Sequence, residues 1–270
     1  MKSLVKQANQ LYHKYFKQII PHFFFVGYIS LLAQYLHNGI FSFLVAIFLC
    51  SIVHGYAKCA MKVVDESEPT LTLNDSLIGI KQFIRYFPTY FVRKLITVVA
   101  VLITILPISL NYTINIPMFT LEWLDYVANN LIQMELFVLD VDLFIPLFQN
   151  IGLIINLLLG IIVFVIMTIL YNFIPYILEE DEYSWMEAMS KSFYLVKNNF
   201  WKIFKFYMIF MIPLVIYIVC SGVIYHFMFL GNDILMLLGL VVLLFAYILI
   251  FKGRFEIGKY LLYKEVKEDE

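Results

Sequence analysis

Carboxylates are the side chains of this sequence whose grouping could do chemistry. One cluster, "EEDE", occupies Glu179–Glu182, and another, "DESEP", runs from Asp65 to Pro69. Clustered carboxylates bind hard cations, so the two clusters could share one if the fold brings them together. The simpler interpretation is a solvated loop that enters a helix, where acids stabilise the N-terminus. We favour that interpretation, also for the acids between 120 and 142, and we predict no metal and no cofactor.

The remaining polar candidates lie within apolar runs. His54 and His226 could be proton-linked groups, although a hydrogen-bonded packing histidine is the simpler interpretation. Asn156 and Asn172 share one run and could line a polar path, or they could bond neighbouring helices. The sequence holds no Walker loop, GxSxG, HExxH or glycine-rich nucleotide motif. We therefore assign no catalytic residue and predict that the protein is not an enzyme.

The composition points to lipid as the environment that positions these groups. The chain has 270 residues, of which 62% are hydrophobic and 14% charged, whereas soluble domains carry about 25% charged residues. A membrane span needs roughly 20 apolar residues. The sequence predicts an all-α integral membrane protein with six spans in one domain, 1–270. The spans are expected near 18–36, 40–62, 92–112, 151–176, 203–227 and 234–255.

The placement of charge predicts the topology. All 19 Lys and Arg residues fall in segments 1–17, 58–94, 177–205 and 252–270. The segments between the other span ends, which include a long acidic one at 113–150, contain none. Because basic residues favour the cytoplasmic side, we expect both termini in the cytoplasm and a bacterial plasma membrane as the location.

An internal repeat is predicted by a shift of 112 residues, which places Thr72 on Ser184 and Asp75 on Glu187. Each unit, about 40–112 and 151–227, would consist of a span, an acidic loop, an amphipathic helix and a second span. Both loops are expected on one side of the membrane, so the repeat would be parallel.

Surface-lying helices are predicted after the acidic loops. In "SWME", Ser184 and Glu187 have the spacing of a capping box, and "TLND" at 72–75 is a weaker version. Apolar residues then recur at helical spacing from Leu73 to Phe87 and from Trp185 to Phe200, with basic residues on the other face. Such helices lie flat at a membrane interface, and residues 2–17 show a similar pattern. The predicted interface residues are Lys81, Arg85, Trp185, Lys191, Lys197, Phe200 and Trp201.

The stretch 171–204 resembles a known pattern, in which a span ends with proline, an acidic pair follows, and a basic-aromatic helix comes next. It is similar to the YciC-like family of bacterial inner-membrane proteins and to the membrane domain of some glycerophosphodiester phosphodiesterases. The resemblance implies a bacterial multi-span protein and supplies no catalytic residue. The matching residues are Pro175, Glu179, Glu180, Ala188, Ser192, Lys197, Asn199, Phe200 and Trp201.

The sequence thus predicts a structural or accessory membrane protein that organises lipid or holds a membrane partner. Its expected partners are membrane lipids and another membrane protein or a second copy, and not nucleic acid. One alternative is an uncoupled transporter or channel for a small or lipidic molecule that uses Asn156 and Asn172. Another is an immunity protein against a membrane-active peptide, acting through the acidic segment.

Overall fold

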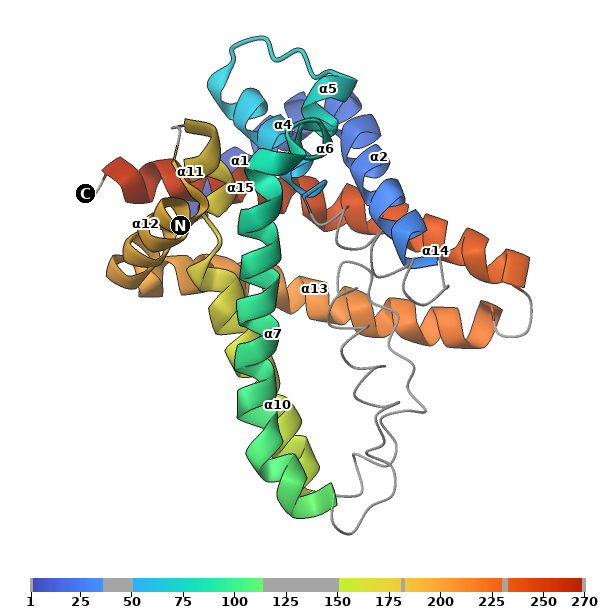
Figure 1. Ribbon diagram of the computed structural model, residues 1–270. Coiled ribbons are helices and arrows are strands. Elements are labelled where there is room, and N and C mark those ends of the chain that lie inside the picture. Colours follow the sequence, from blue (N-terminus) through green and yellow to red (C-terminus); the bar gives the residue numbers. More distant parts are fainter. Residues whose placement is uncertain (1, 36–50, 114–150, 181–182, 230–232, 269–270) are drawn as a thin grey trace. The chain divides into compact units, whose positions relative to one another are not determined.

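The protein is helical throughout the parts that its structure describes. The computed structural model describes residues 2–35, 51–113, 151–180, 183–229 and 233–268, and these contain no strand. A π-helical turn, Ile248–Lys252, follows α14. The α-helices are α1 Lys2–Lys14, α2 Phe16–Tyr35, α4 His54–Asp65, α5 Leu73–Ser76, α6 Ile78–Lys81, α7 Phe83–Thr113, α10 Ile151–Leu170, α11 Ile174–Glu180, α12 Trp185–Asn198, α13 Phe200–Phe229, α14 Asp233–Tyr247 and α15 Gly253–Glu268 (Figure 1).

The chain forms two compact units. Unit 1 contains residues 1–91 and 170–270, and unit 2 contains residues 92–169. The candidate site described below lies wholly within unit 1. Whether both units serve a single membrane domain stays a prediction.

Three helical stretches are long and apolar enough to cross a membrane: Phe83–Thr104, Leu158–Glu180 and Phe200–Tyr217. They correspond to the predicted spans near 92–112, 151–176 and 203–227. Of the other predicted spans, 18–36 coincides with most of α2, and 234–255 coincides with α14, the π-helical turn after it and the start of α15. Part of the predicted span 40–62 lies outside the described residues, so the count of six stays a prediction.

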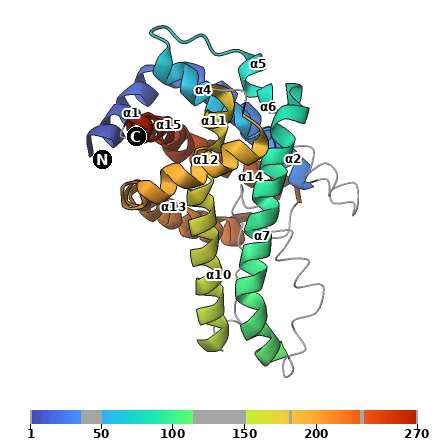
Figure 2. The same ribbon diagram turned by 60° about the vertical axis from the view of Figure 1, so that its left-hand side comes forward.

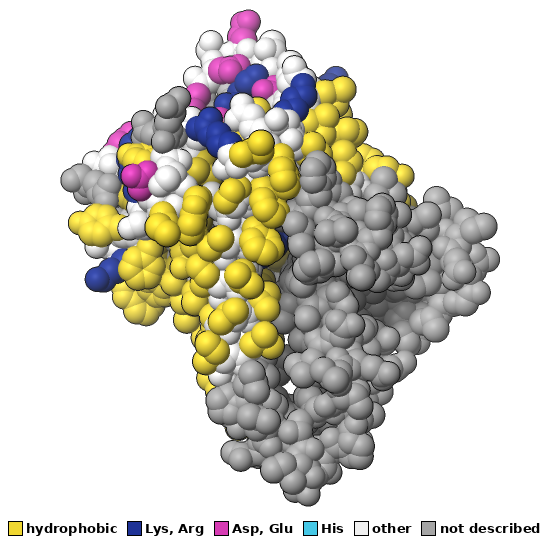
Figure 3. Space-filling model, viewed as in Figure 1, with side chains coloured by type: hydrophobic (Ala, Val, Ile, Leu, Met, Phe, Trp, Pro, Cys, Tyr) yellow, Lys and Arg dark blue, Asp and Glu magenta, His cyan; other side chains and the backbone are white. Residues whose placement is uncertain are grey.

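The exposed surface of these helices is largely apolar. Ile103 of α7 is 65% exposed, and Ile155 of α10 and Ile212 of α13 are 51% and 58% exposed. Figure 3 shows hydrophobic side chains along much of α7. Exposing contiguous apolar surface of this kind to water is unfavourable in free energy, whereas exposing it to lipid is not.

Helix α15 is the centre of unit 1, where it packs against α1, α2 and α4; α1 and α15 lie side by side in Figures 1 and 2. The ring of Tyr12 covers Gly253 so closely that a Cβ there would lie 2.3 Å from Cε2 of the ring. Leu4, Ala8 and Tyr12 form the buried stripe of α1. We expected the apolar stripe of residues 2–17 to face lipid, but these three side chains pack on protein instead.

The predicted continuous helix from Leu73 to Phe87 is broken into α5, α6 and the start of α7. Two glycines explain the break, because they let backbones meet. A Cβ at Gly55 would lie 2.1 Å from the Ser76 carbonyl oxygen, and one at Gly79 would lie 1.9 Å from the Ser51 carbonyl oxygen. The segment therefore folds tightly against α4, which a straight amphipathic rod could not do.

Candidate functional site

His54, at the start of α4, is the buried centre of a polar cluster. Its side chain is fully buried and stacks on the Tyr86 ring with centroids 3.9 Å apart and planes at 20°. Its Nδ1 lies 2.9 Å from the Tyr90 hydroxyl oxygen. Tyr86 and Tyr90 are one helical turn apart, as are His54 and Lys58, so each helix presents two polar side chains on one face.

Glu179 of α11 joins these two helices. One carboxylate oxygen, Oε1, accepts hydrogen bonds from His54 Nε2 at 2.8 Å and from the Tyr86 hydroxyl at 2.6 Å. The other oxygen accepts from the ammonium of Lys58. A carboxylate can only accept, so His54 carries its proton on Nε2, and its neutral Nδ1 accepts from Tyr90. The Glu179 side chain is only 6% exposed. Its three hydrogen-bond donors, one of which is the Lys58 cation, offset the free-energy cost of burying its charge.

This arrangement is a closed network of hydrogen bonds. Both nitrogens of His54 and both oxygens of Glu179 are bonded to groups of the protein itself. Beside them, Arg85 donates to the Leu178 carbonyl oxygen at 2.5 Å. The cluster, which we call the Glu179 lock, fastens α4, α7 and α11 to one another.

The acids that end α4 and α11 are held by α15 in matching ways. Asp65 accepts from the Tyr260 hydroxyl at 2.6 Å and from Lys264 at 3.0 Å. Glu180 accepts from the Tyr263 hydroxyl at 2.7 Å and from Lys267 at 2.6 Å. Each acid therefore takes a tyrosine and a lysine that lie one helical turn apart.

Lys264 and Lys267 thus lie at Asp65 and Glu180, two of the acids for which we had considered a bound cation. The described residues contain no group of three or more His, Cys, Asp or Glu side chains placed to hold a metal. Burial, together with the Asp65 carboxylate, raises the pKa of Tyr260, so its hydroxyl stays a donor. Both acids act as anchors for α15.

A third ionic cluster is centred on Glu256 of α15. Its carboxylate lies 2.7 Å from Lys259 Nζ and 3.2 Å from Lys252 Nζ. Burial on its own would raise the pKa of this carboxyl, but the two ammonium groups outweigh it and lower the pKa to about 2. The Tyr176 hydroxyl lies 3.4 Å from the same carboxylate, which links α11 to α15.

The predicted capping box of α12 is confirmed. The Glu187 amide donates to Ser184 Oγ at 3.4 Å, and the Glu187 carboxylate accepts from the Ser184 amide at 2.9 Å. The corresponding acid Asp75 accepts from the Thr72 amide at 2.8 Å and from Lys62 at 2.9 Å. Burial opposes ionisation of Asp75, yet these donors lower its pKa. Both boxes fit the 112-residue shift, while the repeat itself stays a prediction.

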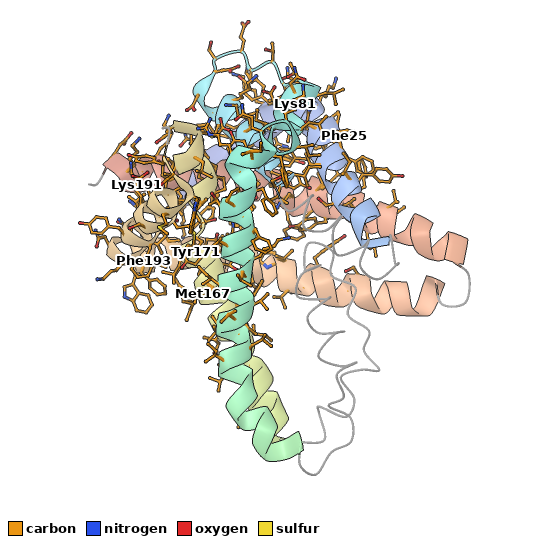
Figure 4. The ribbon with its side chains drawn as sticks, viewed as in Figure 1. Phe25, Lys81, Met167, Tyr171, Lys191 and Phe193 are labelled. Carbon is orange, nitrogen blue, oxygen red and sulfur yellow. The ribbon has the colours of Figure 1, made fainter. Side chains whose placement is uncertain are left out.

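The predicted interface cations differ in whether their charged groups are bonded within the protein or exposed. Lys81 donates to Asn74, Arg85 is engaged with the Leu178 carbonyl, and Lys191 donates to the Tyr183 hydroxyl at 2.9 Å. Lys197 is exposed. Figure 4 labels Lys81 on α6 and Lys191 on α12.

The predicted interface aromatics also divide. Trp201 is 70% exposed, whereas Trp185 and Phe200 are half-buried. Two other apolar residues of the predicted stripe between Trp185 and Phe200, Met189 and Val196, pack inside the protein with 8% and 0% exposure. The predicted stripe therefore packs on protein at Met189 and Val196 and is only half-buried at Trp185 and Phe200.

The two asparagines of the predicted polar path are not brought together within one unit. Asn156 belongs to unit 2, and Asn172 to unit 1. Asn172 is 3% exposed, and its amide nitrogen finds no hydrogen-bond partner among the described residues. It lies in a turn between α10 and α11, where Ser192 Oγ donates to the Leu170 carbonyl at 2.9 Å and accepts from the Phe173 amide at 3.3 Å.

The Glu179 lock was not foreseen as a unit. Glu179 and His54 were considered separately, because 125 residues separate them. The available signal was the pair of one-turn spacings, His54 with Lys58 and Tyr86 with Tyr90, each placing two polar groups on one face of an apolar helix.

Comparisons with family models, curated proteins and solved structures find no match to this chain. The resemblance to the YciC-like family therefore stays a prediction.

Proposed function

We propose that this protein is a non-enzymatic accessory component of a bacterial plasma membrane, related to the YciC-like proteins. Its helical spans would carry a rigid cytoplasmic cap that organises lipid or holds a membrane partner. The observation that carries this proposal is the Glu179 lock, in which the buried His54 side chain and the Glu179 carboxylate hold three helices together.

The other ionic clusters support the same role. Helix α15 binds the ends of α4 and α11 through Asp65 and Glu180, and Glu256 is paired with Lys259 of α15 and with Lys252 of the preceding π-helical turn. Buried polar networks in which every group is hydrogen-bonded make a fold rigid. The exposed apolar helices supply the membrane attachment. The finer expectations, six spans, a parallel repeat and cytoplasmic termini, belong to the same proposal.

Extraction of the protein in native-lipid nanodiscs tests this role, with lipids and proteins identified together by mass spectrometry. An unrelated multi-span protein from the same membrane serves as the control. We expect one lipid class or one membrane protein to be enriched several-fold over the control. Lack of any enrichment, or solute flux across proteoliposomes containing the purified protein, would contradict the accessory role.

Transport is the second candidate, and one observation favours it. The turn at 171–173 interrupts the candidate span Leu158–Glu180, and Asn172 keeps a buried amide nitrogen unpaired there. Transporters often place their sites at breaks in membrane helices. Under this alternative, Asn172→Leu abolishes flux. The immunity alternative relies on the acidic segment 113–150, which lies almost entirely outside the described residues.

A further inference from the structure

The outward face of α12 carries large apolar side chains among its polar ones, although the helix already has a buried apolar face. Met186, Phe193 and Tyr194 are 64%, 44% and 57% exposed, and helical spacing places them on one side together with Lys197. The opposite side, including Leu195 and Val196, is fully buried. The exposed side of a surface helix in water is usually polar, and large apolar side chains grouped there are typical of a surface that meets a membrane or another protein. Figure 4 shows Phe193 and Lys191 on α12.

The start of α13 also exposes a large aromatic side chain beside a lysine. Trp201 is 70% exposed, and Lys205, one turn later, is also exposed. The same face then presents Met208, Ile212 and Ile216, which are 41%, 58% and 60% exposed, within the candidate span Phe200–Tyr217. Tryptophan and lysine ahead of an apolar face are typical of side chains at the headgroup level of a bilayer.

The two lysines of this surface, Lys197 and Lys205, are exposed. Lys197 and Lys205 form no ion pair within the described part of the chain. The one acid between residues 185 and 229 is Glu187, and its carboxylate is turned to the Ser184 cap. The cationic groups therefore remain available to a negatively charged surface, which would be the bilayer that already covers the adjoining face of α13.

We propose that this surface, formed by Met186, Phe193, Tyr194, Lys197, Trp201 and Lys205, docks into the headgroup layer of an anionic leaflet. The aromatic side chains insert beside the first carbons of the acyl chains, and the two lysines bind lipid phosphates. This docking rests on the proposed function and names its partner as anionic phospholipid. It also narrows the predicted interface, because Lys81 and Arg85 are engaged within the protein.

The depth of Trp201 is the first test. The protein and its Trp201→Phe variant are reconstituted in bilayers whose lipids carry bromine near the headgroup or near the chain end, and the difference in fluorescence isolates Trp201. We expect stronger quenching by the shallow bromines. Quenching by neither lipid, or mainly by the deep one, overturns the docking. Flotation of the protein with the vesicles in alkaline carbonate distinguishes this docking from the proposed function. A protein that no longer floats is not embedded in the membrane, which contradicts the proposed function itself.

Lipid selectivity is the second test, measured with spin-labelled phosphatidylglycerol and phosphatidylcholine in the same reconstituted bilayers. Replacing Lys197 and Lys205 with Gln should lower the preference for phosphatidylglycerol by up to about fivefold per lysine, as expected for a basic residue near anionic lipid. Lys2 and Lys6, replaced in the same way, form the control, because the exposed residues of α1 are polar. Equal selectivity in the two double variants overturns the proposal.

Discussion

Replacing Glu179 tests the lock directly. In Glu179→Gln, the remaining oxygen can still accept from His54 and Tyr86, but an amide group faces Lys58 where a carboxylate oxygen did. A hydrogen bond to a charged group contributes about 1.5–3 kcal/mol, and we expect a loss in that range. In Glu179→Ala, the buried donors of His54 and Tyr86 lose their acceptor as well, so the loss should reach about 3–5 kcal/mol. Lys58 is 29% exposed and can turn to water, so we expect the loss of stability to lie near the lower end of each range.

Cys59 provides the readout, because its side chain is 1% exposed on α4 beside Lys58. In a background with Cys50→Ser and Cys220→Ser, a thiol-reactive dye reports the temperature at which α4 opens. Each kcal/mol should lower this midpoint by about 2–4 °C in a chain of this size. The matched control is Glu180→Gln, whose partner Lys267 is 43% exposed and whose loss should stay below about 1 kcal/mol. If the Glu179→Gln and Glu180→Gln variants have the same melting midpoint, the Glu179 lock does not stabilise the fold.

Three further outcomes follow from the same structure. Gly55→Ala should prevent close contact with the Ser76 backbone, where a Cβ would lie 2.1 Å from the carbonyl oxygen, and should lower the melting midpoint more than any surface substitution. Ser192→Ala should leave the turn before α11 without its hydroxyl bridge, cost about 1–3 kcal/mol and speed hydrogen exchange at the Phe173 amide. Glu256, with its pKa lowered to about 2, stabilises the fold on the order of 3 kcal/mol above pH 4.5; this stability should fall between pH 4.5 and 2, and Glu256→Gln should flatten that part of the pH-dependent melting curve.

Hydropathy and capping chemistry predicted what depends on local sequence. The helical fold, three of the apolar spans and the Ser184–Glu187 capping box all followed from residues within about 20 positions of one another. The break between Leu73 and Phe87 could not be predicted in this way, because it depends on Gly55 and Gly79 meeting distant backbone.

The candidate site was predicted less well, for a related reason. A periodic stripe shows that one face of a helix is apolar, but it does not show what covers that face. Tyr12 and Met189 were expected to meet lipid and instead meet protein, whereas Tyr194, outside the predicted stripe, is 57% exposed. The partners of Glu179 lie on helices far away in the sequence, and no local pattern connects them.

The two tyrosine–lysine pairs of α15 also constrain the order of assembly during synthesis. Asp65 and Glu180 leave the ribosome long before Tyr260 and Lys267 do, so each carboxylate must stay hydrated until the late helix arrives. The earlier helices can enter the bilayer meanwhile, but the end of α4 closes against α15 only when about 200 further residues have followed Asp65. A nascent chain stalled before α15 would therefore present open, acid-tipped helix ends to any chaperone at the membrane surface.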